Sequence, residues 1–441
     1  MTVLTMRRSA AVGALILAAA GGLVATQPRI ATAATSEGMV CEYGTAGALA
    51  TGPTTFDLTA TDGYITTPDG NSIYMWGYGD DASSFQLPAP NLCVTAGQSV
   101  TIVLHNVLPE PVSIVVPGLT GMQANGAPAQ PQTDANHAVT SLVQAAPANT
   151  GTMTYTFTPT RPGTYVYESG TDVDKQVQMG LAGALVVRPA ANPDYAYADA
   201  GTKFNPSHEY IYVLSEVDPA LHLAVEQGKP FPWNSYQPRY FMINGRSMPD
   251  TVAPNFAAWL PSQPYGALVH IEPYDATTEM GQRPALIRYV NVGTVNYPFH
   301  PHGADERVIG IDARQLVGAA DGKDLSYDKF LVDVAPGQTV DAEVVWKDVE
   351  HWDPVTNPIP VPLPGLQDQI VGPGNETWFS ESPYLGDQNS LPTGVTNHNE
   401  CGEYYHIAHS HALMHSTNYG ASFGGMMTLD RIDPPGGCPP A

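Results

Sequence analysis

Residues 151–167 read GTMTYTFTPTRPGTYVY. Threonine alternates with methionine, tyrosine and phenylalanine, and Pro162-Gly163 interrupts the pattern, which predicts two β-strands around a turn. Upstream, Cys93 to Asn106 (CVTAGQSVTIVLHN) predicts a turn at Gly97 and then another alternating strand. Downstream, Leu181 to Arg188 is a short apolar strand. Strands and turns at this spacing indicate an all-β protein built as a β-sandwich.

The composition supports the same fold class and excludes one class of partner. The 441 residues include 42 glycines and 41 prolines, which suits short strands joined by many turns better than helices. Only 18 residues are Lys or Arg against 42 Asp or Glu, so the formal net charge is −24. Nucleic-acid phosphates would be repelled by this charge, and we therefore expect no nucleic-acid partner.

The N-terminus has the features of a secretory signal peptide over residues 1–34. Arg7 and Arg8 precede an apolar stretch from Ala10 to Thr26, and Ala31-Thr32-Ala33 is a small-residue cleavage pattern. The alternative is a membrane anchor, but the stretch is short and contains two glycines. We therefore predict a secreted or extracytoplasmic protein with no membrane span after cleavage.

The remaining chain is long enough for two domains. We predict an N-terminal β-domain over residues 38–190 and a C-terminal β-domain over residues 205–435. The polar, proline-bearing stretch 189–206 is the expected linker. In the second domain, Asp218 to Gln227 is a predicted helix, since Pro219 lies near its start and Gly228 follows its end. Residues 352–396, rich in Pro, Gly and Asn, are predicted to form an ordered loop.

Four cysteines allow three disulfide pairings. Proximity in the sequence favours Cys41–Cys93 and Cys401–Cys438, each within one predicted domain. The rival interpretation makes one cysteine a copper ligand. No cysteine lies within the histidine clusters described next, so we predict two structural disulfides.

Histidines are concentrated in two motifs near the C-terminus, YPFHPHG at 297–303 and HSHALMH at 409–415. Each contains His-x-His. In a strand, alternation places both imidazoles of such a pair on one face. Two such strands side by side would offer four imidazoles to one metal, a donor set that suits copper or zinc.

These two motifs resemble those of the multicopper oxidases, proteins built from cupredoxin β-sandwiches. The family's His-Pro-x-His-x-His-Gly matches residues 297–303, and its His-Cys-His-x-x-x-His matches residues 409–415, followed by Gly425-Met426-Met427. The resemblance implies two cupredoxin-like Greek-key domains and copper as the cofactor. It assigns His300 to a type 2 ligand, His302, His409 and His411 to type 3 ligands, and His415 to a type 1 ligand.

At two positions of these motifs, this sequence lacks the residue that ligates copper in the family. Ser410 replaces the type 1 cysteine, and Tyr297 replaces a type 1 histidine and is expected to fill its space by packing. A blue copper site needs a thiolate and two imidazoles, and a serine hydroxyl cannot replace the thiolate. The resemblance therefore implies a divergent member without a type 1 site and without its Cys-His electron path.

The N-terminal region lacks ligands too. The family's His-x-His-Gly-Leu corresponds to Val115–Leu119, and its Tyr-His-x-His corresponds to Tyr167–Gly170. We expect this domain to keep the cupredoxin frame without copper ligands. Glu168 stands in a histidine position and is either a carboxylate ligand or base near the metal or a solvated carboxylate.

From these residues we predict a secreted, metal-binding oxidoreductase with a reduced, histidine-only copper site. His300, His302, His409, His411 and His415 are its candidate ligands, on the C-terminal domain facing the first. A small molecule or a metal ion would be the substrate, with molecular oxygen as acceptor. The alternatives are a non-catalytic exported copper-binding protein, and a structural cupredoxin protein whose histidines are hydrogen-bonded relics.

Overall fold

The computed structural model describes residues 37–43, 53–80, 84–274, 280–346, 404–420 and 424–433. Contacts divide the chain into two compact units, Met1–Ala34 and Thr35–Ala441, and every described residue belongs to the second. The predicted signal peptide, the predicted loop 352–396 and the cysteine pair Cys401–Cys438 lie outside the described residues. Within the described ranges, no helix combines the length and apolar character needed to cross a membrane.

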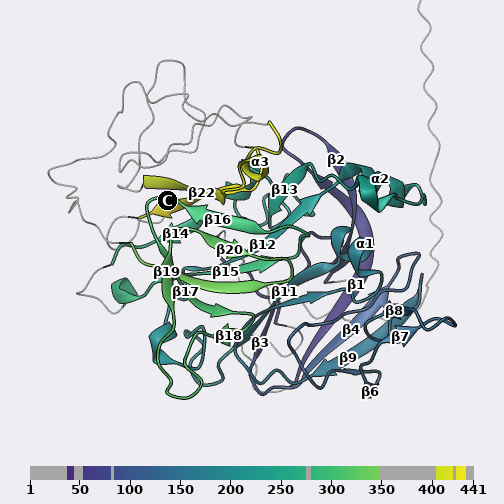
Figure 1. Ribbon diagram of the computed structural model, residues 1–441, viewed down its shortest axis with the longest axis horizontal. Coiled ribbons are helices and arrows are strands. Elements are labelled where there is room, and N and C mark those ends of the chain that lie inside the picture. The colour runs from purple at the N-terminus through teal and green to yellow at the C-terminus, as the bar shows by residue number, and fades with distance from the viewer. Residues whose placement is uncertain are drawn as a thin grey trace, which may run out of the picture. The chain divides into compact units, whose positions relative to one another are not determined.

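The first eleven strands, which we call the N-terminal β-region, form a two-layered sandwich (Figure 1). One sheet has the order β2-β1-β4-β9-β5-β6, the other has the order β10-β11-β3, and β7 pairs with β8 alone. The strands are β1 (Thr54–Thr66), β2 (Ser72–Gly79), β3 (Leu92–Thr95), β4 (Val100–Asn106), β5 (Gln123–Ala124), β6 (Ala127–Pro128), β7 (Gln132–Thr133), β8 (Val139–Ser141), β9 (Gly151–Phe157), β10 (Gly163–Glu168) and β11 (Ala182–Arg188).

The later strands, which we call the C-terminal β-region, form a second sandwich. One sheet has the order β13-β12-β15-β21-β17-β18, with β19 paired to β17, and the other has the order β14-β23-β22-β16-β20. The strands are β12 (Glu209–Val217), β13 (Tyr240–Ile243), β14 (Val269–Ile271), β15 (Ala285–Asn291), β16 (Tyr297–Pro301), β17 (Glu306–Ile311), β18 (Arg314–Gln315), β19 (Tyr327–Lys329), β20 (Val332–Val334), β21 (Thr339–Val344), β22 (Tyr404–Ser410) and β23 (Met427–Ile432).

Helices are few and short, so the described residues form the all-β fold that the sequence predicted. The α-helices are α1 (Val173–Gln178), α2 (Pro219–Glu226) and α3 (Leu413–Ser416). Single 3₁₀ turns are η2 (Ala200–Thr202), η3 (Trp233–Ser235), η4 (Asp250–Val252) and η5 (Met280–Gln282).

Local sequence signals account for several of these elements. The predicted helix is α2, whose first turn is capped by Asp218 accepting a hydrogen bond from the Ala220 amide at 2.9 Å. The two strands predicted around Pro162-Gly163 are β9 and β10, but they belong to different sheets. The turn therefore carries the chain from one layer of the sandwich to the other.

Each sandwich has its own core. In the N-terminal β-region, Leu58 of β1 and Tyr155 of β9 pack against Tyr167 of β10, and all three are fully buried. In the C-terminal β-region, Tyr212 and Tyr289 of one sheet pack against Phe299 of the other, with ring centroids 5.3–5.6 Å apart. Burial of such large rings is the main stabilising contribution to each sandwich.

A smaller apolar cluster joins the two β-regions. Val166 of β10 and Val186 of β11 contact Ile211 and Val213 of β12 and Val290 of β15. Strands of one region face strands of the other here, so the two sandwiches share a buried junction.

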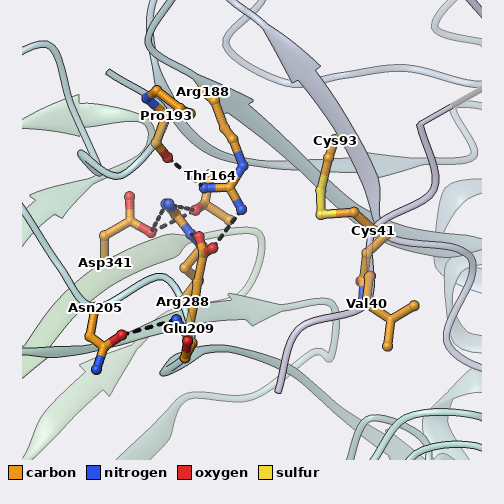
Figure 2. A network of polar contacts seen from close by, with 12 residues as sticks. Val40, Cys41, Cys93, Thr164, Arg188, Pro193, Asn205, Glu209, Arg288 and Asp341 are labelled. Carbon is orange, nitrogen blue, oxygen red and sulfur yellow. Dashed lines mark hydrogen bonds and ion pairs between the residues drawn. A yellow bond between two sulfur atoms is a disulfide. The ribbon is translucent and has the colours of Figure 1, made fainter. Parts of the chain in front are cut away.

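Next to this cluster lies a buried polar network (Figure 2). Arg288 donates to Glu209 Oε1 (2.7 Å) and to Thr164 Oγ1 (3.0 Å), and it lies 3.2 Å from Asp341 Oδ1. Arg188 forms an ion pair with the other oxygen of Glu209. Burial alone would raise the pKa of the Glu209 carboxyl, but the two guanidinium groups hold it below its ordinary value. The charges of the junction are therefore paired.

The N-terminal segment 38–43 runs across both β-regions. The Met39 amide donates to the Glu209 carbonyl (2.8 Å), and the Glu42 amide donates to the Asn91 carbonyl (2.7 Å). The predicted disulfide Cys41–Cys93 is present and fixes this segment to β3 (Figure 2). The segment is therefore attached to both sandwiches.

The stretch 189–206 is not an exposed tether. Ala196, Tyr197 and Phe204 are buried against Leu286 and Ile309 of the C-terminal β-region. The Tyr197 hydroxyl also donates to Asp341 Oδ2 at 2.5 Å. This stretch is thus packed into the fold that it connects.

Candidate metal centre

Strands β16 and β22 bring the two histidine motifs together. They pair antiparallel, and His300 lies directly opposite His409 in the register. The pairing continues beyond both strands, because the His302 amide donates to the Ile407 carbonyl (2.9 Å) and the His411 amide donates to the Pro298 carbonyl (2.7 Å). The adjacent strands predicted from the sequence are therefore present.

Four imidazole rings gather on this strand pair. The His300 ring centroid lies 5.0 Å from that of His302, 5.8 Å from that of His409 and 5.2 Å from that of His411. The His409 ring lies 5.2 Å from His302 and 5.5 Å from His411. We call these four residues the histidine cluster.

Hydrogen bonds to main-chain carbonyls orient two of these rings. Nδ1 of His300 contacts the Phe330 carbonyl, and Nδ1 of His409 lies 2.9 Å from the carbonyl of Ser410. Because a carbonyl only accepts, each Nδ1 carries the proton and each Nε2 keeps a lone pair. An Nδ1–H bound to a carbonyl is the usual support of a histidine that ligates a metal through Nε2.

The charge state of the cluster also suits ligation. Burial lowers the pKa of His409 to about 4, with the neighbouring His302, His300 and His411 adding to the effect. The His409 imidazole is therefore neutral near pH 7. Its Nε2 lies 3.2 Å from Nε2 of His302. In the described part of the chain, no group of three or more His, Cys, Asp or Glu side chains has its donor atoms already arranged to hold a metal ion.

His415 does not join the histidine cluster. It lies on α3, stacks on Phe241 with ring centroids 4.1 Å apart, and places Nδ1 3.1 Å from the Ser410 hydroxyl. Burial lowers the pKa of His415 to about 4, so this imidazole is also neutral at pH 7. The residue in the cysteine position thus binds the imidazole that the resemblance assigns to the same type 1 site.

Tyr297 does more than fill space. Its hydroxyl donates to Glu216 Oε2 on β12, and its ring meets His415 edge-on at 5.6 Å. Glu216 Oε1 accepts from the Thr294 amide (2.7 Å), the Thr294 hydroxyl (2.6 Å) and Gln178 Nε2 (3.1 Å). Burial raises the pKa of the Glu216 carboxyl above its ordinary value, although these donors oppose the shift.

Comparison with known proteins gives the same family as the motifs. Residues 61–192 match the multicopper oxidase family model. This part of the chain is therefore similar to a multicopper oxidase domain. The family is a copper-binding one, as its name states. No curated protein matches the sequence.

Solved structures of multicopper oxidases have the same fold. A blue copper oxidase from Nitrosomonas europaea superposes with a TM-score of 0.55 at 19% identity, covering 87% of this chain and 86% of that one. The multicopper oxidase mgLAC superposes with a TM-score of 0.54 at 18% identity, covering 88% of each chain. At this identity the likeness concerns the cupredoxin fold alone.

In the N-terminal β-region, two stretches correspond to ligand motifs of the multicopper oxidases, Val115–Leu119 and Tyr167–Gly170. Backbone hydrogen bonds join them. The Val115 amide donates to the Glu168 carbonyl (2.8 Å), and the Glu168 amide donates to the Val115 carbonyl (3.0 Å). Burial raises the pKa of the Glu168 carboxyl to about 7. Among the described residues, no hydrogen bond joins that carboxyl to His300, His409 or His411, and a role at the metal stays a prediction.

The remaining candidates near the multicopper oxidase motifs are core residues. Met426 and Met427 are buried at 0% and 2% exposure, as expected. His406 packs against Trp346 with ring centroids 4.6 Å apart and planes tilted by 42°, and it lies opposite Asp430 of β23 in the register.

Two residues of the site were not found from the sequence. Phe330 supplies the carbonyl for His300, and Glu216 binds the tyrosine that replaces a multicopper oxidase ligand. Both are far from the motifs in sequence, and no local pattern marks them.

Proposed function

We propose that this protein binds copper through His300, His302, His409 and His411 and is an oxygen-dependent oxidoreductase. The observation that carries the proposal is the convergence of these four imidazoles on paired strands. A small molecule or a metal ion is the substrate class. His415 is left out of this donor set because its ring is stacked on Phe241 and bound to Ser410.

The residues present fit copper. Imidazole nitrogen is a ligand that copper accepts readily. The carbonyls of Phe330 and Ser410 hold two rings with Nε2 available, so little reorientation of these rings is needed on binding. Bound copper supplies one-electron redox chemistry. The chain itself orients the imidazoles, and the low pKa of His409 keeps that imidazole unprotonated at neutral pH.

A second candidate function is non-catalytic copper binding. The observation that favours it is the filled type 1 position, where Ser410 and His415 bind each other instead of a metal. Aerobic turnover separates the two candidates. Oxygen uptake with a phenol or with ferrous iron supports the oxidoreductase, whereas copper-loaded protein that consumes no oxygen with either supports the binding protein.

The copper site is tested by removing each histidine pair. His300→Ala with His302→Ala, and His409→Ala with His411→Ala, are each expected to lose tight copper binding, since two nitrogens remain. Copper content by metal analysis and the electron paramagnetic resonance spectrum of cupric protein are the measurements. The control is His105→Ala with His137→Asn, a double change outside the cluster in which asparagine suits the positive φ of residue 137.

Wild-type stoichiometry and affinity in both double variants would place the copper elsewhere. Affinity should also fall in acid solution, because the ligands bind as neutral imidazoles and protons compete with the metal.

The proposal also includes export of the protein and its division into two domains. We infer that residues 1–34 are removed on export and that residues 38–190 and 205–435 are separate domains. The Cys41–Cys93 disulfide supports an oxidising compartment. N-terminal sequencing of protein recovered from the culture medium tests the cleavage, and a mature chain that still begins at Met1 would contradict it.

A further inference from the structure

A line of oxidisable side chains leads from the surface toward the type 1 position. Trp233 on η3 is 41% exposed, and its ring centroid lies 6.3 Å from that of Tyr236. The Tyr236 hydroxyl donates to Gln178 Oε1 (2.6 Å) and lies 3.0 Å from Glu216 Oε1. The outer part of the line is thus a tryptophan and a tyrosine that ends at a buried carboxylate.

The inner part of the line begins on the other oxygen of that carboxylate. Tyr297, with no exposed surface, donates its hydroxyl proton to Glu216 Oε2. A Cβ atom on Gly293 would clash with both Oε2 and the Tyr297 hydroxyl, so only glycine leaves room for this pair. Glu216 therefore has a phenol on each oxygen, one facing the surface and one facing the interior.

Tyr297 is connected to the histidine cluster. Its ring lies 5.6 Å from that of His415, whose Nδ1 is 3.1 Å from the Ser410 hydroxyl. Ser410 is the residue between His409 and His411 in the chain. The path from Trp233 therefore ends on the main chain that carries two of the four imidazoles.

We propose that Trp233, Tyr236 and Tyr297 form an electron relay into the histidine cluster, with Glu216 as the proton acceptor for the tyrosines. The relay rests on the proposed copper site, and it supplies the electron path that Ser410 removes. The electron donor is a one-electron reductant such as a phenol at the Trp233 surface.

The inner step balances as a coupled transfer of one electron and one proton. The four histidines would hold the cupric ion that accepts one electron from Tyr297. Within the chain, the Tyr297 O–H bond breaks and its proton forms an O–H bond on Glu216 Oε2. The products on the chain are a Tyr297 phenoxyl radical and a protonated Glu216, and the bound copper would take up the electron.

The outer steps restore Tyr297. An electron from Tyr236 and the proton held by Glu216 Oε2 re-form the Tyr297 hydroxyl. The Tyr236 hydroxyl turns from Gln178 Oε1 to Glu216 Oε1, 3.0 Å away, and gives its proton to the carboxylate. Trp233 then reduces the Tyr236 radical, which recovers its proton from Glu216. The external phenol reduces Trp233 and releases its own proton to solvent.

The arrangement of Glu216 suits this role. An oxidised phenol is a strong acid, so its oxidation in the core needs a base already in contact with the hydroxyl. Thr294 and Gln178 occupy Oε1 with three hydrogen bonds and hold the carboxylate in place. In the described part of the chain, Glu216 Oε2 accepts a hydrogen bond from Tyr297 alone, so this oxygen can take up the tyrosine's proton.

The first experiment needs no copper. Flash-quench oxidation of the copper-free protein with photogenerated tris(bipyridine)ruthenium(III) is expected to give a phenoxyl radical, detected by electron paramagnetic resonance. The Tyr297 component of the signal should be lost in Tyr297→Phe, which leaves a smaller signal of different shape from Tyr236. The signal should be unchanged in Tyr197→Phe, a matched control in which another buried phenol donates to a carboxylate. A signal of wild-type size and shape in Tyr297→Phe, or no phenoxyl signal in the wild-type protein, would overturn the relay.

The second experiment uses the copper-loaded protein. Stopped-flow reduction of the cupric signal by hydroquinone should slow by about tenfold or more in Tyr297→Phe and Trp233→Phe, equivalent to about 1.4 kcal/mol of barrier, with copper content unchanged. Trp259→Phe is the control, since Trp259 is 62% exposed but outside the line. Unchanged rates in both relay variants would overturn the proposal.

The two experiments separate the relay from the copper site. If the wild-type protein binds no copper but forms the Tyr297 radical, the redox role of Tyr297 stands and the proposed copper function fails. If copper binds and is reduced equally fast in all variants, the copper site stands and the relay fails.

Discussion

The Ser410 hydroxyl lies 3.1 Å from His415 Nδ1, so a single substitution would place a thiol beside the imidazole that the family resemblance assigns to a type 1 site. We predict that Ser410→Cys, loaded with copper, shows no intense blue absorption. A blue site needs two imidazoles with the thiolate, and Tyr297 still provides none. Absorption spectroscopy of the copper-loaded variant is the measurement. An intense blue band would show that another residue completes the site.

Arg288 is 1% exposed and neutralises two carboxylates at the junction of the β-regions. We predict that Arg288→Ala lowers the free energy of unfolding by about 3–5 kcal/mol, because Asp341 loses its ion pair with Arg288 and Glu209 loses one of its two buried guanidinium partners. Urea unfolding is the measurement. Lys175→Ala, at a partly exposed ion pair, is the control and should cost about 1 kcal/mol or less. Similar losses in the two variants would contradict a special role for the buried pair.

Single residues also show where sequence reasoning stopped. The motifs identified the four clustered histidines because His-x-His and strand alternation are local features. Tyr297 was expected to pack, and its burial is confirmed, but its hydrogen bond to Glu216 was not foreseen. That contact depends on how β12 and β16 meet across the sandwich, and the sequence near either residue does not encode it.

Among the elements, those with strong local signals were predicted well. Helix α2 has a capping aspartate, an early proline and a terminal glycine, and β11 (Ala182–Arg188) covers nearly all of the short strand expected from Leu181 to Arg188. Which strands share a sheet was not predictable in the same way. β9 and β10 are adjacent in sequence yet lie in different layers, because layer assignment is decided by packing of the whole sandwich.

Strand β14 carries a histidine whose charge links three segments. His270 places Nε2 2.7 Å from Glu37 and Nδ1 3.2 Å from Asp433, beyond the end of β23. Burial would lower the pKa of His270, but hydrogen bonds with Asp433 and Glu37 raise it from 6.5 to about 9. Charged His270 therefore holds both carboxylates at neutral pH.

We predict a loss of stability in alkaline solution from this site. Because the folded pKa exceeds the unfolded one, the contribution is fully present below about pH 6.5 and disappears as the pH rises through about 9. The loss should reach about 3 kcal/mol at most. Urea unfolding across this pH range measures it, and His270→Asn should remove this part of the pH dependence. Equal slopes for the two proteins would contradict the assignment.

At the scale of the whole molecule, the all-β fold class followed from the sequence, but the junction between the two β-regions did not. The apolar cluster of Val166, Ile211 and Val290 and the Arg288 network join segments that no pattern relates. The stretch expected as a polar linker contributes the buried Tyr197 to that junction. Such contacts arise only when two complete sandwiches meet.

The disulfide Cys41–Cys93 adds a covalent bond, which ties the segment 38–43 to β3. We predict that Cys41→Ala with Cys93→Ala lowers the free energy of unfolding by about 2–4 kcal/mol. Thermal or urea unfolding of the oxidised protein and the variant measures the difference. Reduction of the wild-type protein should reproduce it, and should change nothing further in the variant if Cys41–Cys93 is the bridge that matters.

The segment 38–43 also has a consequence for biosynthesis. It emerges early from the ribosome, yet one of its hydrogen-bond partners, Glu209, lies in the C-terminal β-region and is made much later. Until then the segment is held only by the N-terminal β-region, through the bridge to Cys93 and the Glu42–Asn91 hydrogen bond. In a reducing cytoplasm that bridge would not persist. Recombinant production should therefore target the periplasm or the medium. In chains made in the cytosol, segment 38–43 would lack its covalent attachment and would be more accessible to proteases.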